Sequence, residues 1–139
     1  MRIRNWIITL MLAISLPLVA SACGVGEQTP EGYENAPVAH AYEHWQQGSL
    51  SPIPFTFIDV RTPEEYAEGH ISGATLIPVD QVEQRLSEIP KNKQVYVYCR
   101  SGKRSAMAST ILARHGFTNI ENIVGGINGW KEAGYPVEK

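Results

Sequence analysis

Strand-like and helix-like segments alternate along most of this chain and are joined by short loops. Aromatic and β-branched runs predict strands, and apolar residues at helical spacing, bounded by proline or glycine, predict helices. We expect strands at residues 55–60, 75–77, 94–98 and 120–123, and helices at residues 37–47, 62–69, 79–90, 104–115 and 127–133. This order implies parallel strands with helices on both faces, the α/β class.

The clearest strand, residues 94–98, leads directly to Cys99. Its apolar character indicates a place near the centre of the sheet. In open α/β sheets, functional sites form at the carboxyl ends of the strands. Cys99 therefore occupies a position where a functional side chain is expected.

Cys99 begins the polar loop Cys99-Arg100-Ser101-Gly102-Lys103-Arg104-Ser105. If this loop curves into a semicircle, its backbone N–H groups converge to form an anion-binding nest, and the following helix adds its positive N-terminal end. Gly102 supplies the backbone freedom for the curve. The loop also carries three cations, Arg100, Lys103 and Arg104. Together with the N–H groups and the helix end, they stabilise a thiolate, the nucleophilic form of cysteine. A cysteine at this point can also be a small core residue, but the cations beside it favour a nucleophile.

The length of 139 residues leaves room for one domain and a short additional segment. A hydrophobic fraction of 43% with 19% charged residues is typical of a globular domain with a buried core. The net charge of −2 gives no electrostatic reason to expect a nucleic-acid partner. We expect the folded domain at residues 36–139, after a flexible spacer at residues 23–35 that has few bulky apolar residues.

The first 22 residues have the pattern of a signal peptide. Arg2 and Arg4 precede an uncharged apolar run at residues 7–20, and small residues follow it. The run is shorter than the roughly 20 residues of a membrane-spanning helix, which disfavours the alternative of an uncleaved anchor. Cleavage after Ala22 suits the ordinary signal peptidase, but Cys23 at the cut also resembles a bacterial lipobox. We expect export to the periplasm or cell envelope, with Cys23 as the lipid-bearing N-terminus.

Four motifs in this order resemble the rhodanese domain, and together they cover about residues 36–139. They are Asp59-Val60-Arg61, Glu68-Gly69-His70-Ile71-Ser72-Gly73-Ala74, the Cys99 to Ser105 loop, and Gly125-Gly126-Ile127 with Trp130. The exported single-domain form is similar to the small rhodaneses of the phage shock protein E type.

The resemblance implies an open parallel sheet of about five strands and transfer of sulfane sulfur from thiosulfate to a thiophilic acceptor. Cys99 would carry the sulfur as a persulfide, with ping-pong kinetics and without a cofactor. The donor's oxyanion would be bound by Arg100, Ser101, Gly102, Lys103 and Arg104. The acceptor would be a thiol or cyanide. With Cys23 lipidated, Cys99 would have no resolving cysteine in its own chain. Its reductant or acceptor would then have to come from outside, and an external thiol reductant protein is one candidate.

The same resemblance implies supporting roles for residues outside the loop. For Asp59 and Arg61 we expect a structural ion pair that braces the site. We interpret His70 as a histidine whose hydrogen bonds are satisfied within a turn, and Trp130 as core packing.

Other functions are less consistent with the sequence. Cysteine phosphatases and arsenate reductases have one residue more between the cysteine and the arginine than the four that separate Cys99 and Arg104. We expect no metal site, because the histidines form no ligand cluster with Cys99. His40 and His44 are four residues apart, but they lack the glutamate after the first histidine and a third ligand. A persulfide carrier without turnover, or a binding module, stays open as an alternative.

Overall fold

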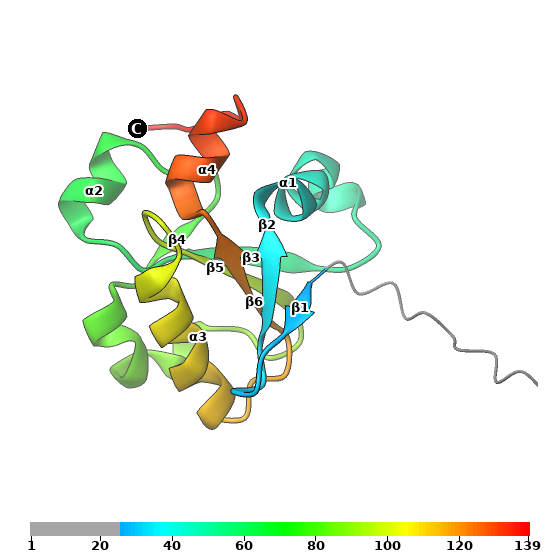
Figure 1. The fold of residues 1–139 in the computed structure, drawn as a ribbon, viewed down its shortest axis with the longest axis vertical. Coiled ribbons are helices and arrows are strands. Elements are labelled where there is room, and N and C mark those ends of the chain that lie inside the picture. The colour runs from blue at the N-terminus through cyan, green and yellow to red at the C-terminus, as the bar shows by residue number, and fades with distance from the viewer. Residues whose placement is uncertain (1–25) are drawn as a thin grey trace, which may run out of the picture.

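A single sheet forms the centre of the computed structural model, which describes residues 26–139 (Figure 1). The strand order in this part of the chain is β1-β2-β6-β5-β3-β4, and the strands pair in parallel except for β1, which is antiparallel to β2. The strands are β1 (Glu27–Gln28), β2 (Glu34–Pro37), β3 (Phe55–Asp59), β4 (Thr75–Leu76), β5 (Gln94–Tyr98) and β6 (Ile120–Val124). The predicted α/β class with an open, mainly parallel sheet is confirmed.

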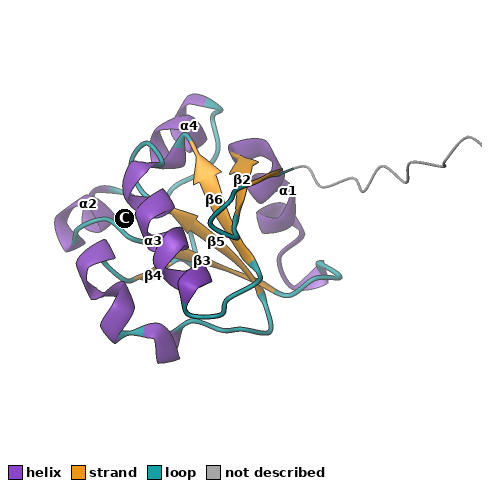
Figure 2. Cartoon of the chain, turned by 60° about the horizontal axis from the view of Figure 1, so that its bottom comes forward, coloured by secondary structure: helices purple, strands orange, loops and turns teal. Residues whose placement is uncertain are grey.

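Helices cover both faces of this sheet (Figure 2). The α-helices of the described residues are α1 (Val38–Gln47), α2 (Pro63–Glu68), α3 (Lys103–Arg114) and α4 (Gly126–Glu132). Short 3-10 segments lie at Gly48–Leu50, Val79–Gln84 and Leu86–Glu88. None of the helices in residues 26–139 is long and apolar enough to cross a bilayer.

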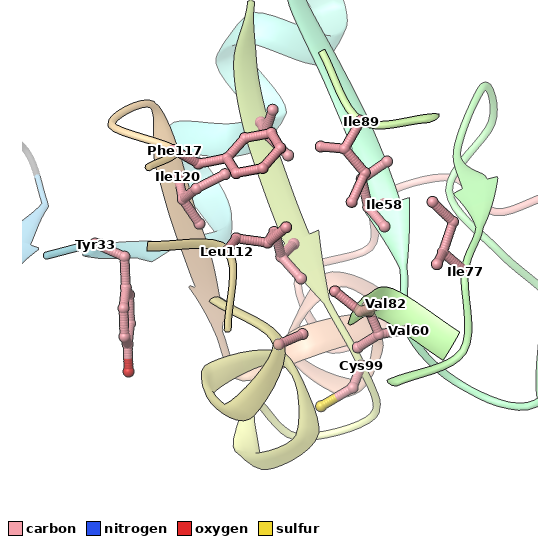
Figure 3. Close-up of a cluster of buried hydrophobic side chains, with 13 residues drawn as sticks. Tyr33, Ile58, Val60, Ile77, Val82, Ile89, Cys99, Leu112, Phe117 and Ile120 are labelled. Carbon is pink, nitrogen blue, oxygen red and sulfur yellow. The ribbon is translucent and has the colours of Figure 1, made fainter. Parts of the chain in front are cut away.

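Alternation along β5 separates the core into two clusters. Val95 and Val97 are buried on the face covered by α3, in the same cluster as Cys99 (Figure 3). Tyr96 and Tyr98 are buried on the opposite face, where α1 and α4 pack. Because successive side chains of a strand point to opposite faces, an almost wholly apolar strand is buried on both sides. The apolar sequence of β5 therefore predicted correctly that this strand lies near the centre of the sheet.

Two reciprocal hydrogen bonds stabilise the start of α2. The Thr62 hydroxyl accepts a hydrogen bond from the Glu65 backbone N–H at 3.3 Å, and the Glu65 carboxylate accepts one from the Thr62 backbone N–H at 3.0 Å. Pro63 occupies the first helical position, where its missing N–H costs no hydrogen bond. This reciprocal pair is a capping box, and it fixes the position of the Glu65 side chain.

Two predictions about local structure were wrong. Part of the expected spacer is in the sheet: β2 pairs in parallel with β6, and the buried Tyr33 closes a turn between β1 and β2. The sheet consequently has the five parallel strands that were expected and a sixth strand, the antiparallel β1, that was not. The polar sequence of β2 carries no strand pattern, and its pairing depends on hydrogen bonds from β6. The helix expected at residues 79–90 is two 3-10 segments instead.

Candidate active site

Cys99 lies directly after β5, at the carboxyl end of a central strand. Its side chain is almost fully buried, with 1% of the residue surface exposed, beside Val60 and Val82 at one end of the core cluster (Figure 3). The thiol is unpaired, and the chain's other cysteine, Cys23, lies outside the described residues. The structure thus places Cys99 at the sheet edge that the sequence indicated.

Hydrogen bonds converge on the Cys99 sulfur from the loop that follows it. The Gly102 backbone N–H lies 3.1 Å from Sγ, and the Ser105 hydroxyl donates to Sγ at 3.4 Å. Burial raises the pKa of the Cys99 thiol, but hydrogen bonds from Ser105, Gly102 and Ser101 outweigh burial, so that its pKa lies below the usual value. Donors stabilise the thiolate more than the thiol, which explains the direction.

Helix α4 holds the outer side of this loop. The carbonyl oxygen of Cys99 accepts from the Ile127 backbone N–H at 2.9 Å, and that of Arg100 accepts from Asn128 N–H at 3.1 Å. The free N–H groups at the start of α4 therefore bind the loop's carbonyl groups. The loop's carbonyl groups thus form hydrogen bonds with α4, while the Gly102 N–H of the same loop forms one with the Cys99 sulfur. Gly126 makes this approach possible, because a Cβ there would lie 2.4 Å from the Cys99 carbonyl oxygen.

The three loop cations have different environments. Arg104 forms a bidentate ion pair with Glu65 of α2, with Nη1–Oε2 and Nη2–Oε1 distances of 2.7 and 2.8 Å. Arg100 is exposed, and its Nε lies 3.5 Å from Glu65 Oε1. Lys103 is exposed at the first position of α3. The hydrogen bonds of Arg104, with help from Thr62 and Arg100, lower the pKa of the Glu65 carboxyl to about 2, so that this carboxylate is ionised at neutral pH.

A buried ion pair lies next to the Cys99 loop, as expected for Asp59 and Arg61. Asp59 ends β3 and stands opposite Tyr98 in the register of β3 and β5. Arg61 Nη2 lies 2.6 Å from Asp59 Oδ2 and also donates to the Gly69 carbonyl oxygen at 2.8 Å. Both side chains are nearly inaccessible. The pair thereby joins the end of β3 to the turn after α2.

His70 and Trp130 have the structural roles that the sequence suggested. His70 is buried, with its ring nitrogens 3.0 Å from the Tyr66 carbonyl oxygen and 3.2 Å from a Glu138 carboxylate oxygen. Trp130 is fully buried and donates its indole N–H to the Pro136 carbonyl oxygen at 2.8 Å. Residues 26–139 contain no group of three or more histidine, cysteine, aspartate or glutamate side chains arranged to hold a metal ion.

Sequence reasoning missed three contributors to the site. It gave no role in the site to Glu65, and no individual role to Ser105 or Gly126. The spacing of Thr62 and Glu65 signals a capping box, but nothing in the local pattern pairs Glu65 with Arg104, which is 39 residues away. The repeated glycine before Ile127 was a visible sign of a close backbone approach.

Comparison with known proteins agrees with this arrangement. The family model of the rhodanese-like domain matches residues 39–133. A sulfurtransferase of Allochromatium vinosum is 42% identical over 80 residues, which cover 58% of this chain and 75% of that protein. The thiosulfate sulfurtransferase PspE of Escherichia coli is 40% identical over 87 residues, which cover 61% of this chain and 72% of PspE. YrkF of Bacillus subtilis is 35% identical over 105 residues, but the matched part of this chain spans only 56% of its length.

Solved structures show the same fold. A rhodanese-related protein of Thermoplasma volcanium has a TM-score of 0.66 and 33% identity, covering 75% of this chain and 96% of that one. A rhodanese from E. coli, solved with anions, has a TM-score of 0.53 and 38% identity over 61% of this chain and 98% of its own. The family match spans well over half of the sequence and includes the loop around Cys99, so this chain belongs to the rhodanese-like domain family.

Proposed function

We propose that this protein is a sulfurtransferase that moves sulfane sulfur from an anionic donor such as thiosulfate to a thiophilic acceptor, through a persulfide on Cys99. The observation that carries the proposal is the set of hydrogen-bond donors around Sγ, from Gly102 N–H and the Ser105 hydroxyl. These donors stabilise a thiolate, the form that attacks sulfur. The names of relatives such as PspE support the same reaction class.

In the first half-reaction, the Cys99 thiolate attacks the outer sulfur of thiosulfate. A new S–S bond forms to Cys99 while the S–S bond of thiosulfate breaks, and sulfite leaves with the bonding electron pair. The product is the anion Cys99–S–S⁻. Loop N–H groups and the positive end of α3 would stabilise its terminal charge, and Lys103 and Arg100 at the loop surface would attract the donor.

In the second half-reaction, an acceptor nucleophile attacks the terminal sulfur of the persulfide. With a thiolate, the product is an acceptor persulfide; with cyanide, it is thiocyanate. In both cases the Cys99 thiolate leaves with the electron pair and returns to its starting form. The step needs neither a metal nor a redox cofactor.

Intact mass spectrometry before and after exposure to thiosulfate tests the proposal. We expect a gain of one sulfur atom, removed again by cyanide, in the wild-type chain and in a Cys23→Ser variant. A Cys99→Ser variant should gain none, and its thiosulfate:cyanide turnover should be lost. Equal turnover in the wild type and in Cys99→Ser would contradict the assignment of the nucleophile.

A second candidate is a persulfide carrier that passes sulfur to one dedicated partner. The similarity to YrkF, which is named as a sulfur carrier protein, supports this alternative. Stable persulfide formation without steady-state turnover to cyanide or small thiols would favour the carrier, whereas many turnovers per Cys99 would favour the enzyme.

For the location of the protein we propose export, with Cys23 as a lipid-bearing N-terminus in the cell envelope. The proposal depends on the order of basic, apolar and small residues before Cys23, all of which lie outside the described residues. The mass of the mature protein tests it. A mass increased by acyl chains at Cys23 supports lipidation, and an unmodified mature chain that begins near residue 23 contradicts it.

A further inference from the structure

Glu65 is an acidic group that contacts two of the three loop cations, Arg104 and Arg100. Its carboxylate makes two short bonds to the Arg104 guanidinium, accepts from the Thr62 backbone N–H, and lies 3.5 Å from Arg100 Nε. Both oxygens are thus engaged, and the Glu65 side chain has only 16% of its surface exposed. The carboxylate is therefore held in one place by the capping box on one side and by Arg104 on the other.

The ion pair with Glu65 reduces the number of hydrogen-bond donors of Arg104 that an anion can reach. Both terminal nitrogens of Arg104, the end that forms a fork for oxyanions, already bind Glu65. Arg104 nevertheless belongs to the loop around Cys99, because it directly precedes Ser105, whose hydroxyl donates to Sγ at 3.4 Å. The neighbouring Glu65 carboxylate raises the pKa of the Arg104 guanidinium. A donor with two negative charges would consequently meet a carboxylate that competes with it for Arg104 and repels it.

We propose that Glu65 is a specificity-determining residue that weakens the binding of dianions at the Cys99 loop, and so favours sulfur donors of lower charge, such as organic persulfides, over thiosulfate. The inference rests on the proposed function for its substrates, although the effect on anion binding does not require turnover. Removing the charge of Glu65 would release Arg104 for the anion and abolish the repulsion. Because solvent and salt screen charges at a partly exposed site, the expected gain in dianion affinity is about three- to tenfold.

The test uses sulfate, an unreactive dianion, as the probe. Alkylation of Cys99 by iodoacetamide is followed on the Cys99 peptide by mass spectrometry, at constant ionic strength, with increasing sulfate. In Glu65→Gln, half-protection should need about three- to tenfold less sulfate than in the wild type. Glutamine at this position keeps the capping box, so α2 should remain folded. The control Glu64→Gln removes the same charge from an exposed neighbour in the same helical turn, and it should match the wild type.

Further variants separate charge from structure. Glu65→Asp retains the negative charge, so half-protection of Cys99 should need nearly as much sulfate as in the wild type. Glu65→Ala should resemble Glu65→Gln, and it replaces that variant if the glutamine variant does not fold. In thiosulfate turnover, Glu65→Gln should lower KM with little change in kcat. An equal or greater sulfate requirement in the neutral variants would overturn the proposal and make Glu65 an anchor for Arg104. Absence of thiosulfate turnover in the wild type would instead contradict the proposed function, and the sulfate measurement would still decide the role of Glu65.

Discussion

Replacing Gly126 by alanine should displace the loop that contains Cys99. The new Cβ would lie 2.4 Å from the Cys99 carbonyl oxygen and 2.7 Å from the Arg100 carbonyl oxygen. Neither oxygen can move away easily, because each accepts a hydrogen bond from the first turns of α4. Relief of the clash must therefore shift the loop, α4, or both.

The cost has two parts. Gly126 has a φ of +54°, and a left-handed conformation costs a residue with a Cβ about 1–2 kcal/mol. Overpacking against fixed backbone adds about 1–3 kcal/mol, so that we expect a loss of about 2–5 kcal/mol in the free energy of unfolding. Gly134→Ala is the matched control: Gly134 has a φ of +78° but nothing within 4 Å of the added Cβ. It should show the backbone cost alone.

Urea unfolding, followed by tryptophan fluorescence to which the buried Trp130 contributes, measures the unfolding free energy of both variants. Gly126→Ala should be less stable than Gly134→Ala by the overpacking cost of about 1–3 kcal/mol. Its Cys99 should also react more slowly with iodoacetamide at neutral pH, because displaced N–H groups stabilise the thiolate less. Equal unfolding free energies and equal alkylation rates in the two variants would refute the close contact between α4 and the loop.

Three further outcomes are expected. Asp59→Ala leaves Arg61 buried without its carboxylate partner, so the free energy of unfolding measured with urea should fall by about 3–5 kcal/mol. A decrease of less than about 1 kcal/mol, which is typical of an exposed pair, would contradict a structural ion pair. Ser105→Ala removes a donor to Sγ, so the pKa of Cys99 should rise; the pH profile of iodoacetamide alkylation should move to higher pH, and an unchanged profile would exclude this hydrogen bond. Glu65 has its pKa lowered from 4.5 to about 2, so its contribution to stability is present above about pH 4.5 and is lost as the pH falls towards 2. Urea midpoints should therefore fall less steeply over this range in Glu65→Gln than in the wild type, and parallel curves would argue against the pair with Arg104.

Local patterns in the sequence determined most of the secondary structure and the position of the candidate nucleophile, Cys99. The strand at β5, the capping box at the start of α2 and the helix after the Cys99 loop all depend on residues within a few positions of one another. Side-chain periodicity and capping chemistry act at that range. The topological rule for open α/β sheets then placed Cys99 at a functional edge before any distance was known.

The tertiary structure alone decided which groups surround Cys99 and compete for its cations. The pair of Glu65 with Arg104 and the bonds from α4 to the Cys99 and Arg100 carbonyls join segments far apart in the sequence. The polar strand β2 likewise exists through its pairing with β6. Such contacts have no local signature, because they arise only when the sheet order brings separate strand ends and helix starts together. The sequence therefore identified a cysteine in a cationic loop as the candidate nucleophile, and the packing of α2 and α4 against that loop decided which of its charged and polar groups are already paired.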